Sequence, residues 1–202
     1  MRIGVLISGS GTNLQAIMDA STQGLLEADV AVVVSNRQDA YGAERARKAG
    51  VPAVWIDRTE YTTFRAYNEA IRDVLVAYEV DIVAMAGYMR LLGKEVLDAF
   101  PHRVVNIHPS LLPSFPGPSA IREAFEYGVK VTGVTVHIAS ERFDEGPIIA
   151  QGVVEVAEDE TLESLEAKIH EVEHRIYPAA LQLMVAGCVT ISGRRALISP
   201  AP

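Results

Sequence analysis

The chain has 202 residues, of which 49% are hydrophobic and 22% charged, so it can bury a sizeable core, and global disorder is excluded. Its net charge of −8 argues against broad nucleic-acid binding, which needs a basic surface. The length suits one domain, residues 1–202, built from two joined halves at about 1–108 and about 109–202.

Cys188 is the single cysteine, which excludes an intrachain disulfide and a cysteine-rich metal site and fits a reducing compartment. The apolar run after Arg2 soon ends in the serines and glycines of residues 8–11. It is too short for a signal peptide or a membrane span. We therefore expect a soluble cytoplasmic protein without membrane contact.

Apolar strands alternate with helices in the first half of the chain. The predicted strands are residues 3–7, 30–34, 53–56, 82–86 and 104–107. The helices between them are predicted near residues 13–20, 42–48, 64–78 and 94–100. Because most of these strands are continuously apolar, the pattern indicates a parallel sheet that is covered on both faces.

The second half has a different pattern. A loop rich in proline and glycine leads to a helix at 120–127, two strands at 130–138 and 148–156, and a long helix at about 162–185. Residues 189–192 and 196–199 are predicted to form a hairpin around Gly193. The whole chain thus predicts an α/β fold, a doubly wound, mostly parallel, Rossmann-like sheet with antiparallel additions in the C-terminal half.

Glycines and small polar residues occupy the turn between the first strand and the first helix, at residues 8–13. Such a turn lets backbone N–H groups and a helix N-terminus approach an anion. It has no third glycine of a dinucleotide fingerprint and no P-loop lysine, so it suits a single phosphate. A tight turn that merely caps the helix is the alternative.

Asn106 and His108 end a strand and are predicted to point to the same face, because side chains alternate along a strand. Pro109 ends the strand at that point. An amide donor beside an imidazole suits a site where negative charge develops on an oxygen, as in acyl-type transfer. Asp144, 36 positions later, would stabilise the protonated imidazole.

Each of these three residues also has a purely structural interpretation. His108 could be a satisfied histidine at a strand end, Asn106 could cap a turn, and Asp144 could begin one. Their position favours function, because parallel sheets bind ligands outside the carboxyl ends of their strands. His137, inside a later strand, could face the same crevice or be a buried structural histidine, and we favour the structural interpretation slightly.

His170, Glu171 and His174 match the His-Glu-x-x-His zinc signature. No Asp, Glu or His follows His174 to supply a third ligand, and Pro178 is expected to interrupt the helix. An apolar stripe explains this helix as a core element. We therefore expect no metal.

At these motifs the chain resembles the formyltetrahydrofolate-dependent formyltransferases, and the resemblance covers nearly its whole length. The matching stretches are VLISGSGTNLQAI (5–17), AGYMRLL (86–92), NIHPSLLP (106–113), GVTVH (133–137) and DEGPII (144–149). The third stretch, with a later Asp, is typical of the superfamily. The glycine loop narrows the resemblance to members that act on a phosphorylated ribosyl amine, or to the deformylases. We expect neither the N-terminal regulatory domain of the deformylases nor the C-terminal tRNA-binding domain of methionyl-tRNA formyltransferases.

The resemblance implies transfer of a formyl group from 10-formyltetrahydrofolate, the co-substrate, to the amine of glycinamide ribonucleotide in de novo purine biosynthesis. It implies two small-molecule substrates and leaves a homodimer open. The implied catalytic residues are Asn106, His108 and Asp144. The implied phosphate and ribose contacts are Gly11, Thr12, Asn13, Glu173 and His170. The implied folate contacts are Arg65, Met89, Arg90, Leu91, Leu92, Leu97, Asn106, Asp144 and the loop at 139–144.

The chain departs from relatives at a few positions. Phe64 stands where relatives often carry a basic residue for the folate tail, and whether the adjacent Arg65 replaces it is open. Ser114 and Ser119 stand where some members have Lys and His. Two other hypotheses remain: a formyltransferase or deformylase with another substrate, and a non-catalytic phosphosugar-binding module.

Overall fold

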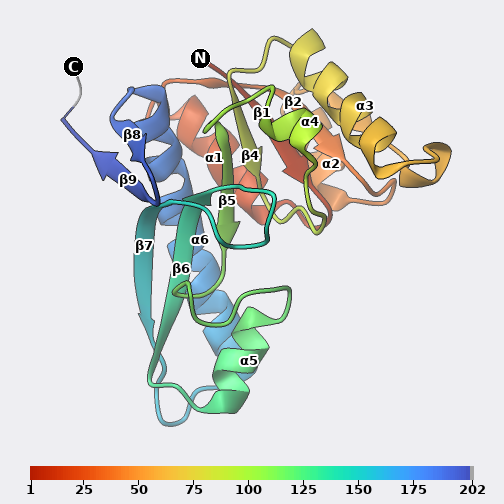
Figure 1. Cartoon of the computed structure of the whole chain (residues 1–202). Helices are drawn as coiled ribbons and strands as arrows, with labels where there is room; N and C mark the ends of the chain where they lie inside the picture. The colour runs from red at the N-terminus through yellow and green to blue at the C-terminus, as the bar shows by residue number, and fades with distance from the viewer. Residues whose placement is uncertain (201–202) are drawn as a thin grey trace.

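The structure, a computed structural model that describes residues 1–200, is a nine-stranded sheet with helices on both faces (Figure 1). The sheet order is β3-β2-β1-β4-β5-β6-β7-β9-β8. Its strands are β1 (Arg2–Ile7), β2 (Asp29–Ser35), β3 (Ala53–Trp55), β4 (Ile82–Met85), β5 (Val104–His108), β6 (Val131–Ile138), β7 (Ile148–Glu155), β8 (Val189–Ser192) and β9 (Arg195–Ile198). Its helices are α1 (Thr12–Thr22), α2 (Tyr41–Lys48), α3 (Phe64–Ala77), α4 (Lys94–Leu97), α5 (Ala120–Tyr127) and α6 (Leu162–Val185), with a 3-10 turn η1 (Arg58–Glu60).

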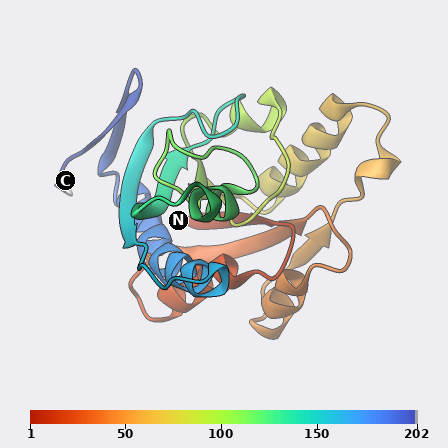
Figure 2. The ribbon, with the colours of Figure 1, turned by 90° about the horizontal axis from the view of Figure 1, so that it is seen from below.

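Two hydrophobic cores pack against the sheet. Figure 2, a view from below, shows helices on both sides of the sheet. One core joins the sheet to α1, α2 and α6, and the other joins it to α3 and the segment around α4. Ile3, Val5 and Ile7 of β1 enter the first core, whereas Leu6 enters the second. Burial on both faces explains why these strands are continuously apolar, and the predicted doubly wound sheet is confirmed.

The sheet changes direction at β5. Strands β3, β2, β1, β4 and β5 are parallel, whereas β6 runs antiparallel to β5 and β7 antiparallel to β6. The β5–β6 register sets Asn106 opposite His137 and His108 opposite Thr135. The predicted antiparallel additions are therefore present, and the first of them lies directly beside the strand with the Asn/His pair.

Some predicted bounds shift. Helix α4 ends at Leu97 rather than near residue 100, and the turn η1, capped by Asp57 through a 2.8 Å bond from the Thr59 N–H, was not expected. The C-terminal hairpin forms, with its second strand one residue earlier than predicted. Its strand β9 also pairs in parallel with β7 at Ile148 and Arg195. The hairpin thus belongs to the main sheet.

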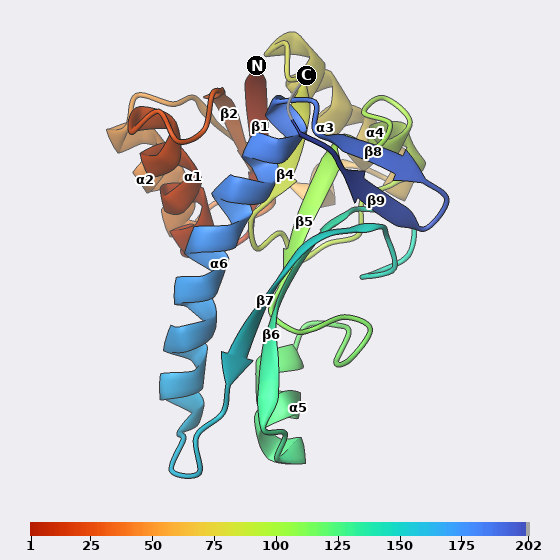
Figure 3. The same cartoon turned by 90° about the vertical axis from the view of Figure 1, so that its left-hand side faces the viewer.

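Helix α6 continues through Pro178, so the expected interruption is wrong (Figure 3). A proline inside a helix loses one backbone hydrogen bond and costs about 3 kcal/mol. Burial offsets this cost, because Tyr177 and Leu181 on either side of Pro178 are both fully buried in the first core. No helix within residues 1–200 has the length and apolar character needed to cross a membrane.

Candidate active site

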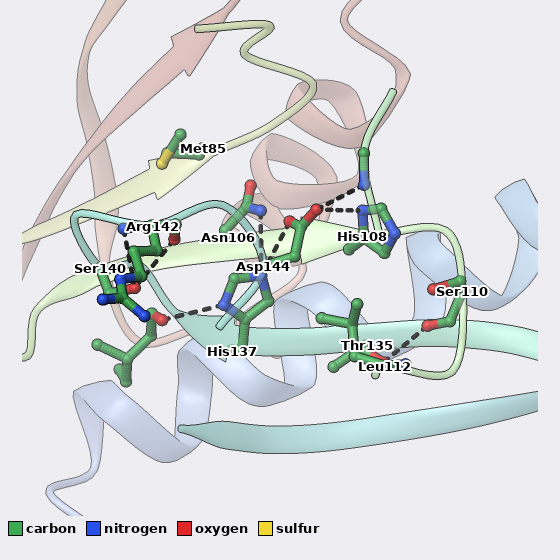
Figure 4. Close-up of polar contacts among 12 residues, drawn as sticks. Met85, Asn106, His108, Ser110, Leu112, Thr135, His137, Ser140, Arg142 and Asp144 are labelled. Atoms are coloured by element: carbon green, nitrogen blue, oxygen red, sulfur yellow. Dashed lines mark hydrogen bonds and ion pairs between the residues drawn. The ribbon is translucent and has the colours of Figure 1, made fainter. Parts of the chain in front are cut away.

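Asn106 and His108 point to the same side of β5, as predicted, and meet Asp144 from the loop between β6 and β7 (Figure 4). Nδ1 of His108 lies 3.5 Å from Oδ2 of Asp144. Nε2 of His137 lies 3.7 Å from the other carboxylate oxygen. The carboxylate is therefore flanked by two imidazoles, and Asn106 adjoins the second.

The two ring nitrogens of His108 have different partners in the protein. Nε2 lies 2.8 Å from the carbonyl oxygen of Phe115. Because a carbonyl can only accept, Nε2 carries a hydrogen and donates it. Nδ1, which faces Asp144 at a distance too long for a strong hydrogen bond, can therefore accept a proton and donate it again.

Asn106 is oriented by His137. Nδ1 of His137 donates to the Ile138 carbonyl at 3.0 Å, so its Nε2 can accept from the side-chain amide of Asn106, at 3.2 Å. This contact uses one of the two amide hydrogens of Asn106 and leaves the other to meet a substrate oxygen. Our slight preference for a purely structural His137 does not describe this arrangement, because the ring contacts two of the three predicted catalytic residues.

Asp144 is buried, with a side chain 6% exposed, in a left-handed backbone conformation with φ 57°. The Gly117 amide donates to its Oδ2 at 2.9 Å. Burial acts to raise the pKa of Asp144, but His137, the Gly117 amide and His108 together outweigh burial and leave this pKa below its usual value. The group is thus a carboxylate at neutral pH.

A buried polar network holds the loop after β5, which carries Phe115 and Gly117. The Thr135 hydroxyl donates to the Ser110 carbonyl at 2.7 Å and accepts from the Leu112 amide at 3.0 Å. Thr135 is fully buried. Sequence reasoning missed Thr135, Phe115 and Gly117 as supports of the site. The signal for Thr135 is its register opposite His108, which is apparent once β5 and β6 are paired.

The predicted phosphate loop lines a cavity of about 410 Å³ at the N-terminus of α1. Gly11 has φ 72°, and the first turn of α1 carries no acidic residue that would repel an anion. Gly42 of α2 packs against Gly11, where a Cβ on Gly11 would lie 2.5 Å from the Gly42 Cα. Arg45 adds a hydrogen bond of 2.9 Å to the Ser10 carbonyl. These contacts from α2 hold the phosphate loop in place.

Glu173 and His170 of α6 line the same cavity, as predicted. The Asn13 amide donates to Oε2 of Glu173 at 3.0 Å. Burial raises the pKa of Glu173, against the opposing effects of Asn13 and His170. The predicted phosphate and ribose residues are therefore brought together, Gly11, Thr12 and Asn13 from the loop and Glu173 and His170 from the helix.

A narrow slot of about 30 Å³ lies against the other side of the strand end. Five of the predicted folate residues line it, namely Arg90, Leu91, Leu92, Asn106 and Asp144. The wall is completed by Met85, by His137 and by residues 139, 140, 142 and 143 of the following loop. Met89 lines the phosphate-side cavity instead and is 69% exposed.

The remaining predicted folate residues lie elsewhere. Arg65 pairs with Glu69 at 2.9 Å on α3 and lines a separate hollow beside α4. Leu97 packs against the second core. The structure does not bring either residue to the slot. Of the two substituted serines, Ser119 lines the phosphate-side cavity, and the Ser114 carbonyl accepts a hydrogen bond from Ser110.

The zinc-like pair lies on one helical face, as its spacing predicts. The rings of His170 and His174 stack with centroids 6.3 Å apart. Within residues 1–200 there is no cluster of three His, Cys, Asp or Glu side chains that could hold a metal ion. His170 instead faces the cavity that Glu173 lines.

Comparison with known proteins shows the family of this chain. Residues 1–181 match the sequence family described as formyl transferase. Phosphoribosylglycinamide formyltransferase of Bacillus subtilis is 40% identical over 91% of this chain and 94% of its own length. The trifunctional purine biosynthetic protein adenosine-3 of Gallus gallus is 40% identical over 95% of this chain, which spans only 19% of that protein.

Solved structures agree as well. Glycinamide ribonucleotide transformylase 1 from Symbiobacterium toebii superposes with a TM-score of 0.96 at 55% identity, over 98% of this chain and 93% of the other. Phosphoribosylglycinamide formyltransferase from Bacillus halodurans gives a TM-score of 0.89 at 44% identity, over 92% and 95%. In sequence and fold, the chain belongs to the formyl transferase family.

Proposed function

We propose that the chain transfers the formyl group of 10-formyltetrahydrofolate to the amine of glycinamide ribonucleotide, giving formylglycinamide ribonucleotide and tetrahydrofolate. One observation carries the proposal: the end of β5 forms a wall shared by two cavities. Asn106 lines the slot, and its neighbour Ile107 lines the phosphate-side cavity. Ligands in the two cavities would therefore border the same strand end, near the Asn106 amide.

The phosphate-side cavity fits the acceptor. The N-terminus of α1 would bind the phosphate through its backbone N–H groups. The Glu173 carboxylate would accept hydrogen bonds from the ribose hydroxyls, with His170 nearby. Relatives named for phosphoribosylglycinamide support this assignment of the acceptor.

The residues that line the slot suit the planar end of the folate. Leu91 and Leu92 offer apolar contacts, and Arg90 and the loop at 139–144 offer polar ones. The slot is much smaller than ligand cavities of about 300–1,000 Å³. The wall formed by residues 139–143 must therefore move outward as the donor enters. Both partners are small molecules, and we place the reaction in the cytoplasm, in line with the single cysteine.

The side chains support a tetrahedral route. As the acceptor amine forms a bond to the formyl carbon, the formyl oxygen becomes negative. The free amide hydrogen of Asn106 would donate to that oxygen, and the positive charge of the protonated His108 ring would stabilise it. The carbon–N10 bond then breaks, the amine loses one proton and N10 gains one, so the reaction consumes no net proton. Asp144 would hold the charged ring of His108 and order the water that moves this proton.

The test is a formyl-transfer assay with purified protein, 10-formyltetrahydrofolate and glycinamide ribonucleotide. We expect formylglycinamide ribonucleotide and tetrahydrofolate in equal amounts. Formate release without the amine would instead identify a deformylase. Binding of the ribonucleotide without any transfer would identify a phosphosugar-binding module. Either result contradicts the proposal.

A further inference from the structure

The Tyr177 side chain of α6 reaches two strands of the sheet from beneath the site. It is fully buried in the first core. Its hydroxyl lies 2.9 Å from the carbonyl oxygen of Val105 and 3.1 Å from that of Met85, so its single hydrogen is shared between these two acceptors. Val105 and Met85 belong to β5 and β4, which are paired neighbours in the sheet.

The two carbonyls lead directly into the site. The Val105 carbonyl belongs to the peptide unit whose nitrogen is that of Asn106, and a peptide unit is planar. A hydrogen bond to this oxygen therefore constrains the backbone that carries the Asn106 side chain. The Met85 carbonyl belongs to the peptide unit of Ala86, which precedes the Gly87 turn (φ 74°) and borders the phosphate-side cavity.

The hydroxyl group of Tyr177 needs an explanation other than packing. A phenylalanine would fill the same apolar space, and burying a hydroxyl is unfavourable unless it is hydrogen-bonded. Burial, and then Glu173, raise the pKa of Tyr177 well above its usual value, so the phenol keeps the proton that it donates. Packing alone therefore gives no reason for a tyrosine here, whereas the two carbonyls do.

The same helix also reaches the phosphate loop. Glu173 lies four residues before Tyr177, about 6 Å along the helix axis, and is bonded to Asn13. Helix α6 thus connects the loop that would hold the acceptor phosphate to the strand end that would hold the reacting oxygen. A shift of the helix against the strands would change the distance between these two parts.

We propose that Tyr177 is a positioning residue, whose hydroxyl fixes the ends of β4 and β5 so that the Asn106 amide faces the point where the two substrates meet. This inference rests on the proposed formyl transfer. Tyr177 lines neither cavity, so its effect would pass through the backbone of Asn106 rather than through substrate binding.

The variant Tyr177→Phe tests the inference, because it removes one oxygen and keeps the ring. We expect kcat for formyl transfer to fall about tenfold, with KM for both substrates within about twofold of wild type. The matched control is Ser21→Ala, which removes a comparable hydrogen bond, from the Ser21 hydroxyl to the Ala28 carbonyl at 2.7 Å. Ser21 lies near the C-terminal end of α1, away from the phosphate loop. It should lower the melting temperature while keeping kcat.

A second measurement needs no activity. In ¹⁵N NMR spectra of the ligand-free protein, the side-chain amide signal of Asn106 should shift in Tyr177→Phe and stay in place in Ser21→Ala. An unchanged Asn106 signal, a kcat within twofold of wild type, or an equal kcat loss in Ser21→Ala would overturn the inference. If the wild type transferred no formyl group, the proposed function would fail, and the Asn106 signal would still decide whether Tyr177 positions that amide.

Discussion

Nδ1 of His108 faces Oδ2 of Asp144 across 3.5 Å, while the opposite nitrogen of the same ring is fixed on the Phe115 carbonyl. In the proposed mechanism the two nitrogens have different roles: Nε2 holds the ring in place, and Nδ1 accepts and releases protons. Asp144 is itself held by the Gly117 amide. The loop at 109–118 therefore supports both members of the pair, which links its conformation to the chemistry.

Changes to the three predicted catalytic residues test this division of roles. We expect Asn106→Ala, His108→Ala and Asp144→Asn each to lower kcat by about 10²–10³, the usual effect of losing one oxyanion donor. Asp144→Asn keeps an oxygen that can accept from the Gly117 amide, so the loop should stay ordered. Steady-state formyl transfer and circular dichroism check the two expectations. Near-wild-type kcat in any variant would remove that residue from the mechanism.

Glu173→Gln should stabilise the protein at neutral pH. Because the pKa of Glu173 is raised above its ordinary value of 4.5, the folded state binds this proton more tightly than the unfolded state, and stability falls as the pH rises through this window. Glutamine does not ionise, so it removes this loss of stability, and it can still accept a hydrogen bond from Asn13. Its melting temperature should exceed wild type at pH 7, and the difference should vanish below about pH 4.

The same variant separates stability from binding. KM for glycinamide ribonucleotide should rise, because the neutral amide is a weaker acceptor for the ribose hydroxyls than a carboxylate. Equal melting temperatures at pH 7, or a difference that grows on acidification, would contradict the assigned burial effect.

Gly42→Ala should damage the acceptor site from outside the cavity. The new Cβ would lie 2.6 Å from the Ile7 side chain and 3.1 Å from the Gly11 Cα, so the phosphate loop must shift. Overpacking of this kind costs about 1–3 kcal/mol. We expect KM for the ribonucleotide to rise about tenfold, with KM for the folate unchanged as the internal control. Equal changes in both KM values would indicate general disruption.

The C-terminal hairpin, which lies beyond the residues matched by the family, should influence the folate side. Arg194 at its turn donates to the Glu145 carbonyl at 3.0 Å, next to Asp144. Arg194→Ala should lower kcat/KM for 10-formyltetrahydrofolate about threefold, the effect of one modest hydrogen bond. Arg195→Ala removes the same charge from a side chain with no hydrogen bond or ion pair to residues 1–200, and should leave kcat/KM unchanged. Identical effects of the two substitutions would point to charge alone.

Much of this architecture follows from local pattern. Continuously apolar strands separated by helices predict a doubly wound sheet, because only burial on both faces favours such strands. The alternation along β5 likewise predicts that Asn106 and His108 share a side. Glycines after the first strand predict the phosphate loop for a conformational reason, since Gly11 has a positive φ.

The rest depends on contacts that local pattern does not encode. The contact between His137 and Asn106 requires the β5–β6 register, and the Phe115 and Gly117 contacts require the path of a loop without periodicity. The expectation that Pro178 interrupts α6 is wrong for a related reason. The burial of its neighbours outweighs the free-energy cost of a proline inside a helix. Arg65 could not be placed from its sequence position either, since the direction of an exposed side chain depends on its partner Glu69.

The antiparallel pairing of β5 and β6 limits how this chain can change length. Inserting one residue into β6 would turn His137 to the opposite face of the sheet and bring a different side chain against Asn106. The short connection between α5 and β6, residues 128–130, lies at the other end of β6 from this pair and can absorb insertions. Natural length variation within this segment of the chain should therefore collect at residues 128–130 and be rare between residues 131 and 147.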